Sequence, residues 1–312
     1  MKTVETYTYA HTRVFLPCLF LIIYSLPTFA QTNLSTAIQN TRNACSGISD
    51  SMYDMKVKAG INTAVTSVGT VAGGVALGTG IAKANVDKEI DLLLALDRAP
   101  AATERDSNSI ELSSDDYNVL LTLNPDANKI SELEQKSKTL GNVRTGTLAA
   151  STVTNIAGTA IAATNKVSDD LEENIQKCIE SVKELSNAKL TAKMEKTATD
   201  AEIAFADQII NACRDYEYVD LKPINKRATG AAVSSGIGIG TGVIGTITSA
   251  VANTDKTRNG DIQTEKGLNT TANIMAGAST GASAVATIFN ATQISAIKKV
   301  ANVAEVCEGA LK

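Results

Sequence analysis

The 312-residue sequence lacks tryptophan and contains a single histidine, His11. Because His11 lies in a segment that we expect to be removed, the remaining chain cannot assemble a Ser-His-Asp or Cys-His catalytic arrangement. The scarcity of histidine also argues against an ordinary zinc site, and the cysteines are too widely spaced to resemble a zinc ribbon. The sequence therefore predicts no enzyme activity, no cofactor and no metal.

Aromatic residues are also scarce, at 4% of the chain, so any core must be built from alanine, valine, isoleucine, leucine, glycine and threonine. An excess of positive charge is missing as well. Residues 1–30 hold Lys2, Arg13 and Glu5, which leaves 27 basic and 32 acidic residues and a net charge of −5. Phosphate binding needs a clustered basic face, so this balance predicts no nucleic-acid partner.

Residues 1–30 have the pattern of a secretory signal peptide. Lys2, His11 and Arg13 accompany an apolar run at 14–26, and small residues before Gln31 offer a cleavage site. The run is short for a helix that must cross a bilayer core of roughly 30 Å, although an uncleaved anchor is the alternative. We expect an exported protein that is periplasmic, on the cell surface or secreted.

The chain after residue 30 contains an internal duplication. At a shift of 168 residues, 43–45 aligns with 211–213 and 84–88 with 252–256; at a shift of 128, 150–152 aligns with 278–280. The change of shift leaves an insertion at 89–130 in the first copy. Chance similarity of Ala/Gly-rich sequence is the alternative, but the cysteines also match. We predict a first copy at 31–188 and a second at 189–312.

Each copy has two arms of nearly equal length between its cysteines. Arms of equal length, folded as a hairpin, bring the two cysteines to the same end. A disulfide needs Cα atoms about 4.4–6.8 Å apart, so this geometry favours Cys45–Cys178 and Cys213–Cys307. Pairing of Cys45 with Cys307 and of Cys178 with Cys213 stays open if the copies pack tightly.

The arms fit helix better than strand, although residues 236–240 alternate with the period of a strand. Alanine-rich 147–163 favours helix, and glycine, which costs up to about 1 kcal/mol in a helix, is tolerated where helices approach closely. We predict an all-α fold, an elongated bundle of four helices made from two disulfide-linked hairpins. The expected helix-packing glycines, spaced four residues apart, are Gly69 and Gly73, Gly74 and Gly78, Gly236 and Gly240, and Gly277 and Gly281.

Four stretches carry no charge, at 59–82, 145–165, 228–254 and 267–297, and each is long enough to cross a bilayer. Such stretches require burial on nearly every side. Threonine, serine, glycine and asparagine dilute their hydrophobicity, which argues against lipid. We expect a non-enzymatic structural or interaction protein that associates with itself or with another envelope protein. A membrane-inserting or pore-forming protein is the alternative.

Two short motifs match catalytic patterns in letters only. Residues 277–281 fit the nucleophile-elbow pattern around Ser279, but no histidine can serve that serine. Residues 240–245 fit the dinucleotide fingerprint without the strand, turn and helix that it needs. Both are interpreted as helix packing.

Overall fold

The computed structural model describes residues 33–103, 127–254, 257 and 262–312. The predicted signal peptide at 1–30 and residues 104–126 of the predicted insertion lie outside this described part. Within it the chain is helical without a strand, which confirms the all-α class. The elements are α2 (Leu34–Cys45), α3 (Ile48–Thr103), α5 (Ala127–Thr164), α6 (Asp169–Glu195), α7 (Asp200–Cys213), the 3₁₀ helix η2 (Arg214–Tyr218), α8 (Lys222–Ala252) and α10 (Ile262–Leu311).

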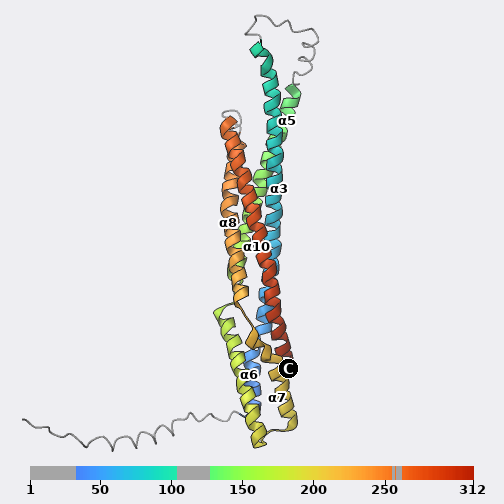
Figure 1. The fold of residues 1–312 in the computed structure, drawn as a ribbon, viewed down its shortest axis with the longest axis vertical. Coiled ribbons are helices and arrows are strands. Elements are labelled where there is room, and N and C mark those ends of the chain that lie inside the picture. Colours follow the sequence, from blue (N-terminus) through green and yellow to red (C-terminus); the bar gives the residue numbers. More distant parts are fainter. Residues whose placement is uncertain (1–32, 104–126, 255–256, 258–261) are drawn as a thin grey trace, which may run out of the picture.

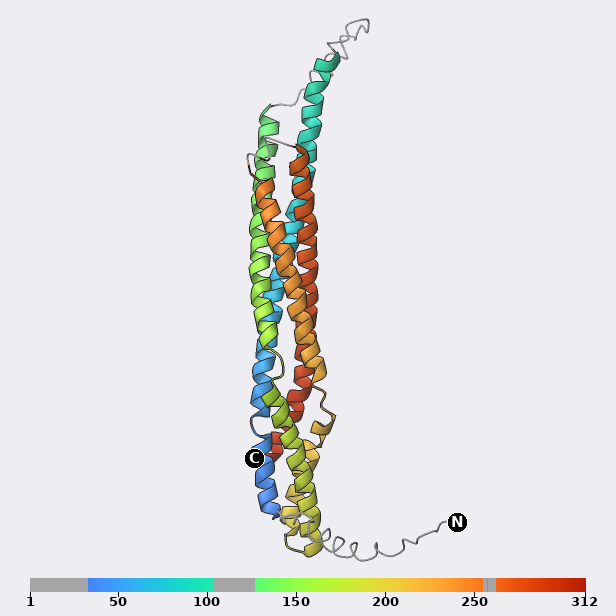
Figure 2. The ribbon, with the colours of Figure 1, turned by 90° about the vertical axis from the view of Figure 1, so that its left-hand side faces the viewer.

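Helices α3, α5, α8 and α10 form a long bundle in which neighbours run in opposite directions (Figures 1 and 2). α3 and α8 each pack against both α5 and α10, so α5 and α10 face each other across the axis. We call the charge-free part of this bundle the shaft: residues 59–82, 145–165, 228–252 and 267–297. These stretches lie at one level, because Asn165 Nδ2 donates to the Met55 carbonyl at one end and Arg144 Nη2 donates to Asn269 Oδ1 at the other.

Below the shaft, α2, α6, α7 and η2 pack around the lower ends of α3 and α10 and form what we call the base (Figure 1). The base has an ordinary apolar core in which Met52, Ile175, Leu185 and Ile209 are at most 2% exposed. Burial of each such side chain stabilises the fold by about 1.5–3 kcal/mol. The base therefore has the packing of a soluble helical domain.

Local sequence explains where the helices of the base end. The Ser168 hydroxyl accepts from the Leu171 N–H at the start of α6, followed by acidic residues in the first turn. α6 ends at Lys196, which adopts the left-handed conformation with φ 54°. Thr199 and Glu202 then form a capping box at the start of α7.

These breaks alter the expected hairpins. α3 and α10 run continuously from base to shaft, whereas the other two arms are interrupted at 165–168 and at 214–221. α6 also continues across residues 188 and 189, where the two copies were expected to meet. At the opposite end, α3 and α5 extend beyond α8 and α10 (Figure 1), and residues 89–103 of the insertion prolong α3.

Candidate functional site

The interior of the shaft is polar. Its buried positions carry glycine, alanine and hydrogen-bonding side chains, and Leu148 is the one large apolar side chain between the two ends of the described shaft. The buried polar side chains are Asn62, Thr66, Ser151, Thr152, Asn155, Asn165, Ser234, Ser235, Ser249, Asn269, Ser279, Ser283, Asn290 and Gln293.

The exterior of the same stretches is apolar. Valine and isoleucine side chains on all four helices are between 44% and 67% exposed. They are Ile61, Val68, Val71, Val75, Ile81, Val153, Ile156, Val233, Ile237, Ile244, Ile247, Val251, Ile274, Val285 and Ile288. A water-soluble bundle places such side chains inside and its polar ones outside. The shaft therefore has inverted polarity, while the base beneath it does not.

Hydrogen bonds connect the polar interior across the axis. The Ser283 hydroxyl donates to Asn155 Oδ1 at 2.9 Å, and Gln293 Nε2 donates to the Asn165 carbonyl at 2.8 Å. One level higher than Gln293, Asn62 Nδ2 donates to Asn290 Oδ1 at 2.9 Å. Buried polar groups stabilise a fold only when such partners are present.

Charged side chains fill the interior at the upper end of the shaft. Arg144 is fully buried, and its guanidinium donates to Ser249 Oγ at 2.8 Å and to Asn269 Oδ1 at 2.7 Å. Lys83, also fully buried, lies 2.6 Å from a carboxylate oxygen of Asp87 and 3.0 Å from one of Glu265. These contacts join α3, α5, α8 and α10 at one level and close the upper end of the bundle with paired charges.

Threonines on the flanks of the shaft turn their hydroxyls back to their own helices. Thr70 donates to the Thr66 carbonyl at 3.0 Å, Thr159 to that of Asn155 at 2.8 Å, and Thr248 to that of Ile244 at 2.9 Å. A hydroxyl satisfied four residues back along the helix presents mainly its methyl group outward. The threonines that dilute the hydropathy of these stretches therefore add little polar surface.

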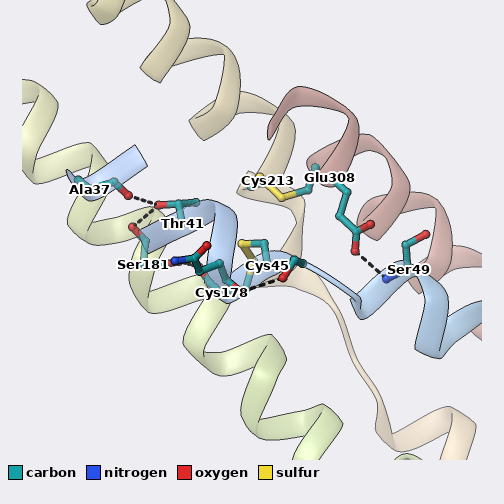
Figure 3. Close-up of a disulfide and its surroundings, with 11 residues drawn as sticks. Ala37, Thr41, Cys45, Ser49, Cys178, Ser181, Cys213 and Glu308 are labelled. Atoms are coloured by element: carbon teal, nitrogen blue, oxygen red, sulfur yellow. Dashed lines mark hydrogen bonds between the residues drawn. A yellow bond between two sulfur atoms is a disulfide. The ribbon is translucent and has the colours of Figure 1, made fainter. Parts of the chain in front are cut away.

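The structure forms the disulfides that the arm lengths favour. Cys45 and Cys178 are bonded with Cα atoms 4.7 Å apart, and Cys213 and Cys307 with Cα atoms 4.5 Å apart. The two bonds lie together in the base (Figure 3), and the sulfurs of Cys45, Cys213 and Cys307 lie within 4.8 Å of one another. Because each sulfur is in a disulfide, none is the thiolate that a zinc site requires.

Hydrogen bonds around the disulfides join segments that are far apart in the sequence. The Thr41 hydroxyl donates to the carbonyls of Ala37 and Ser181, at 2.9 and 3.1 Å, and the Ser49 N–H donates to Glu308 at 2.9 Å (Figure 3). The bond to Ser181 links α2 to α6, and the bond from Ser49 to Glu308 links the start of α3 to the end of α10. The disulfides therefore lie where the N-terminal and C-terminal segments of the described chain meet.

Of the eight glycines expected at helix contacts, the structure places two there. A Cβ on Gly69 or Gly73 would lie 2.7 Å from Thr154 Oγ1 or 2.5 Å from Thr280 Oγ1. The other six have no neighbouring heavy atom of the described residues within 4 Å of that position: Gly74, Gly78, Gly236, Gly240, Gly277 and Gly281.

Other glycines make the close contacts instead. On α8 they are Gly230, Gly238, Gly242 and Gly245, of which Gly238 and Gly242 lie two residues after the expected Gly236 and Gly240. On α5, Gly158 approaches Thr66 and Asn62. The run at 236–242 offers two pairs of glycines four residues apart, and spacing alone does not choose between them. Ser235 and Ser249 share the inward face with Gly238 and Gly242 and could have indicated the phase.

The two motifs with catalytic letters lie inside helices. Ser279 is fully buried in α10, and its hydroxyl lies 3.3 Å from the Gly238 carbonyl and 3.4 Å from the Ser151 hydroxyl. Residues 240–245 are in the middle of α8. Neither motif has the strand-to-helix turn that its chemistry requires.

The base contains a cavity of about 770 Å³ between α6 and the segment that joins η2 to α8. Ile175, Ile179, Tyr216 and Leu221 line it together with charged side chains such as Lys183. The Tyr216 hydroxyl is buried without a hydrogen-bond partner. Burial, followed by the charge of Glu308, raises the pKa of Tyr216, so the phenol stays neutral.

Two helical stretches of the described chain are long and apolar enough to cross a membrane, Leu34–Ala95 and Lys222–Ala252. The core helix of a soluble protein passes the same test, but it is mostly buried. Here only 28% and 33% of the two apolar windows are buried. Comparison with protein-family models, with curated protein sequences and with solved structures finds no match to this chain.

Proposed function

We propose that this is an exported, non-enzymatic protein whose shaft inserts into a lipid bilayer while its base stays in water. The observation that carries the proposal is the inverted polarity of the shaft, which begins where the ordinary core of the base ends. Four charge-free stretches side by side offer lipid an apolar surface on every side. The two disulfides suit the oxidising compartment that export implies.

The dimensions of the shaft fit a membrane. Residues 59–82 of α3 are all helical, and at 1.5 Å per residue they span about 36 Å. A bilayer core is about 30 Å thick, so the charge-free length covers it with a small margin. Within such a core each backbone polar group must be satisfied by the protein, as continuous helices achieve.

The polar residues of the shaft oppose membrane insertion less than their number in the sequence indicates. The asparagines that would be costly in lipid are turned inward: Asn155, Asn165 and Asn269 are at most 8% exposed, and Asn273 accepts from Arg144. Full burial of a valine or isoleucine side chain is worth about 1.5–3 kcal/mol, and these half-exposed side chains would forgo a corresponding part of it by facing water. Lipid therefore suits this surface better than solvent does.

A collar of basic residues marks the boundary between shaft and base. It is formed by Lys56, Lys58, Lys166, Lys226, Arg227, Lys298 and Lys299, which come from α3, α8, α10 and the turn that follows α5. Asp54 pairs with Lys58 at 2.6 Å, and Asp169 and Asp170 follow at the start of α6, so the collar keeps an excess of positive charge. Such a collar fits the headgroups of anionic lipids.

Flotation of the purified chain, without residues 1–30, on liposomes that contain anionic lipid tests the proposal. Val153 is 65% exposed in mid-shaft, and Val153→Lys should abolish flotation because a charge at the bilayer centre costs about 2.5–3.5 kcal/mol. Met194 is 76% exposed in the base, and Met194→Lys is the matched control that should still float. Failure of the unaltered chain to float with any lipid mixture contradicts the proposal.

Self-association is the second candidate, and the six outward glycines favour it. Gly74 and Gly78 on α3, and Gly236 and Gly240 on α8, keep the spacing at which helices approach closely, but none of the described residues covers them. A second copy in the bilayer, or another envelope protein, would fit there. Crosslinking in liposomes should give dimers or larger oligomers, and Gly236→Leu should reduce them; a strictly monomeric protein would contradict this candidate.

We also propose that the two halves of the shaft arose by tandem duplication. Eight of the nine buried positions between Gly141 and Asn165 have a buried counterpart 128 residues later in α10, and the ninth, Thr152, corresponds to the partly buried Thr280, which supports the proposal. For α3 and α8 the inward positions correspond at a shift of 169, one more than the sequence match. The residues matched at a shift of 168 therefore do not face the same way in α3 and α8, and the support for duplication comes from α5 and α10.

A further inference from the structure

Five buried polar atoms along the shaft have no hydrogen-bond partner. They are Asn62 Oδ1, Asn155 Nδ2, Asn165 Oδ1, Ser235 Oγ and Gln293 Oε1, and each belongs to a side chain that is at most 1% exposed. Leaving such a group unpaired costs about 1–3 kcal/mol. Buried water molecules are the usual partners of polar atoms of this kind.

These atoms occupy consecutive levels rather than one pocket. Gln293 and Asn165 share the lowest level through their hydrogen bond of 2.8 Å. Asn62 and Ser235 follow, both close to Gly158, and Asn155 lies above them beside Gly238. The Ser151 and Ser279 hydroxyls, 3.4 Å apart, continue the series upward. Water that satisfies the five atoms would therefore form a file along the axis.

One apolar layer interrupts this polar series. Leu148, Ala76 and Ala276 form a separate buried cluster, with Leu77 packed against it. Above it the interior is polar again, with Arg144 bonded to Ser249, Asn269 and Asn273. An apolar constriction between two hydrated segments blocks conduction by excluding water.

We propose that the shaft encloses a file of water that relays protons across the bilayer, and that the Leu148 layer closes it. This rests on the proposed membrane insertion. Protons suit the path better than hydrated ions do. At Gly158 the interior is so narrow that an added Cβ would lie 2.8 Å from the Thr66 side chain and 3.4 Å from the Ser235 hydroxyl. A proton needs only a chain of hydrogen bonds through water and hydroxyl groups.

Proton flux into liposomes that hold the full chain without residues 1–30 tests this inference. A pH-sensitive dye inside the vesicles reports the flux, which a potassium gradient with valinomycin drives. The unaltered protein should leak little. Leu148→Ser, which replaces the apolar layer with a hydroxyl, should raise the flux by about tenfold or more. Ala276→Ser adds a hydroxyl to the same layer at a much smaller change of volume, and it should also raise the flux.

Matched variants separate conduction from general leakiness. Leu148→Met keeps the layer apolar, and Val153→Ser changes an outward position of the same helix, so both should leave the flux at the level of the unaltered protein. Adding Asn155→Leu to Leu148→Ser should return the flux toward that level by removing one unpaired atom.

Flotation of the same preparations distinguishes a failure of the proposed membrane insertion from a failure of the proposed proton path. If the unaltered chain does not float, membrane insertion is wrong, and the proton path is wrong with it. If the Leu148→Ser and Ala276→Ser proteins float with intact disulfides and their flux equals that of the unaltered protein, insertion stands and the proton path is overturned.

Discussion

Ser283 and Asn155, 128 residues apart, are joined by a hydrogen bond of 2.9 Å from the serine hydroxyl to the amide oxygen. The bond connects α10 to α5 across the axis of the shaft. Since Asn155 Nδ2 has no partner, the amide depends on Ser283 for its protein hydrogen bond. A polar pair of this kind favours the rotation at which these faces of the two helices meet, because another rotation would leave the Asn155 amide unpaired, whereas the Ser283 hydroxyl can still donate to the Ser279 carbonyl of its own helix at 2.9 Å.

Ser283→Ala should lower the free energy of unfolding by about 1–2 kcal/mol, because it leaves a buried amide without its donor. Thermal unfolding followed by circular dichroism measures the effect. Ser295→Ala is the control, since Ser295 is exposed on the same helix. Equal stability of the two variants would show that the bond contributes nothing.

Two glycines of α8 should respond to alanine in opposite directions. A Cβ on Gly238 would lie 2.8 Å from the Asn155 amide carbon, so Gly238→Ala should destabilise the protein by about 1–3 kcal/mol. Gly240 has open space around it, and Gly240→Ala should stabilise by about 0.5–1 kcal/mol through helix propensity. Denaturation midpoints of the two variants give the comparison. The same sign for both would contradict the phase of α8.

The disulfides should each contribute strongly to stability. They close segments with sequence separations of 133 and 94, for which loop entropy gives roughly 4–5 kcal/mol each. Paired replacement of Cys45 and Cys178 by alanine should cost about that amount in urea denaturation, and the Cys213 and Cys307 pair should cost a similar amount.

Mass mapping of the non-reduced protein checks the connectivity itself. The four sulfurs lie close together, so a Cys45–Cys307 linkage would need little movement of the chain. Finding that linkage, or free thiols, would contradict the structure and weaken the inference of export.

The sequence alone was enough to predict helical arms and the cysteine pairing, because arm length and the disulfide distance do not depend on how the helices are rotated. The sequence does not determine how each helix is rotated about its own axis, and so which of its faces points into the bundle. Gly236 and Gly240 have the same spacing as Gly238 and Gly242, and only the second pair faces inward. The choice depends on which residues of α8 meet Asn155 and Thr152, and both lie on another helix.

The inverted polarity was missed for a related reason. Counting residues shows that threonine, serine and asparagine dilute the charge-free stretches, but not that they gather on one face. The expectation that asparagine argues against lipid assumed that Asn155 and Asn269 face outward. Both point into the bundle. An asparagine or serine every three or four residues, opposite valine or isoleucine, is the pattern that could have indicated the inversion.

The start of α7 should lose stability in acid. The Glu202 carboxylate accepts from the Thr199 N–H at 2.8 Å, and this bond lowers the pKa of Glu202 below 4.5. Because the folded pKa is the lower one, the contribution is present above the unfolded pKa and disappears as the pH falls through the folded pKa. Glu202→Gln should therefore lower the thermal midpoint at pH 7 but not at pH 2.5. An equal difference at both values would contradict the role of charge.

Lipid charge should govern how the protein docks. Lys226 and Lys298 are exposed in the basic collar, and each lysine near an anionic surface contributes about 1 kcal/mol. Replacing both with glutamine should weaken flotation on anionic liposomes by roughly 30-fold, since 1.4 kcal/mol corresponds to tenfold. High salt should remove most of the difference because it screens exposed charges.

Lys193 and Lys196, exposed at the far end of α6, give a control with the same change of net charge. Glutamine at both should leave flotation unchanged, because they lie a helix length away from the collar (Figure 1). Equal losses in the two double variants would mean that net charge, and not the collar, attracts the protein to lipid. If the collar variant alone is impaired, the collar is the part of the base that meets the anionic leaflet, as the proposed insertion of the shaft requires.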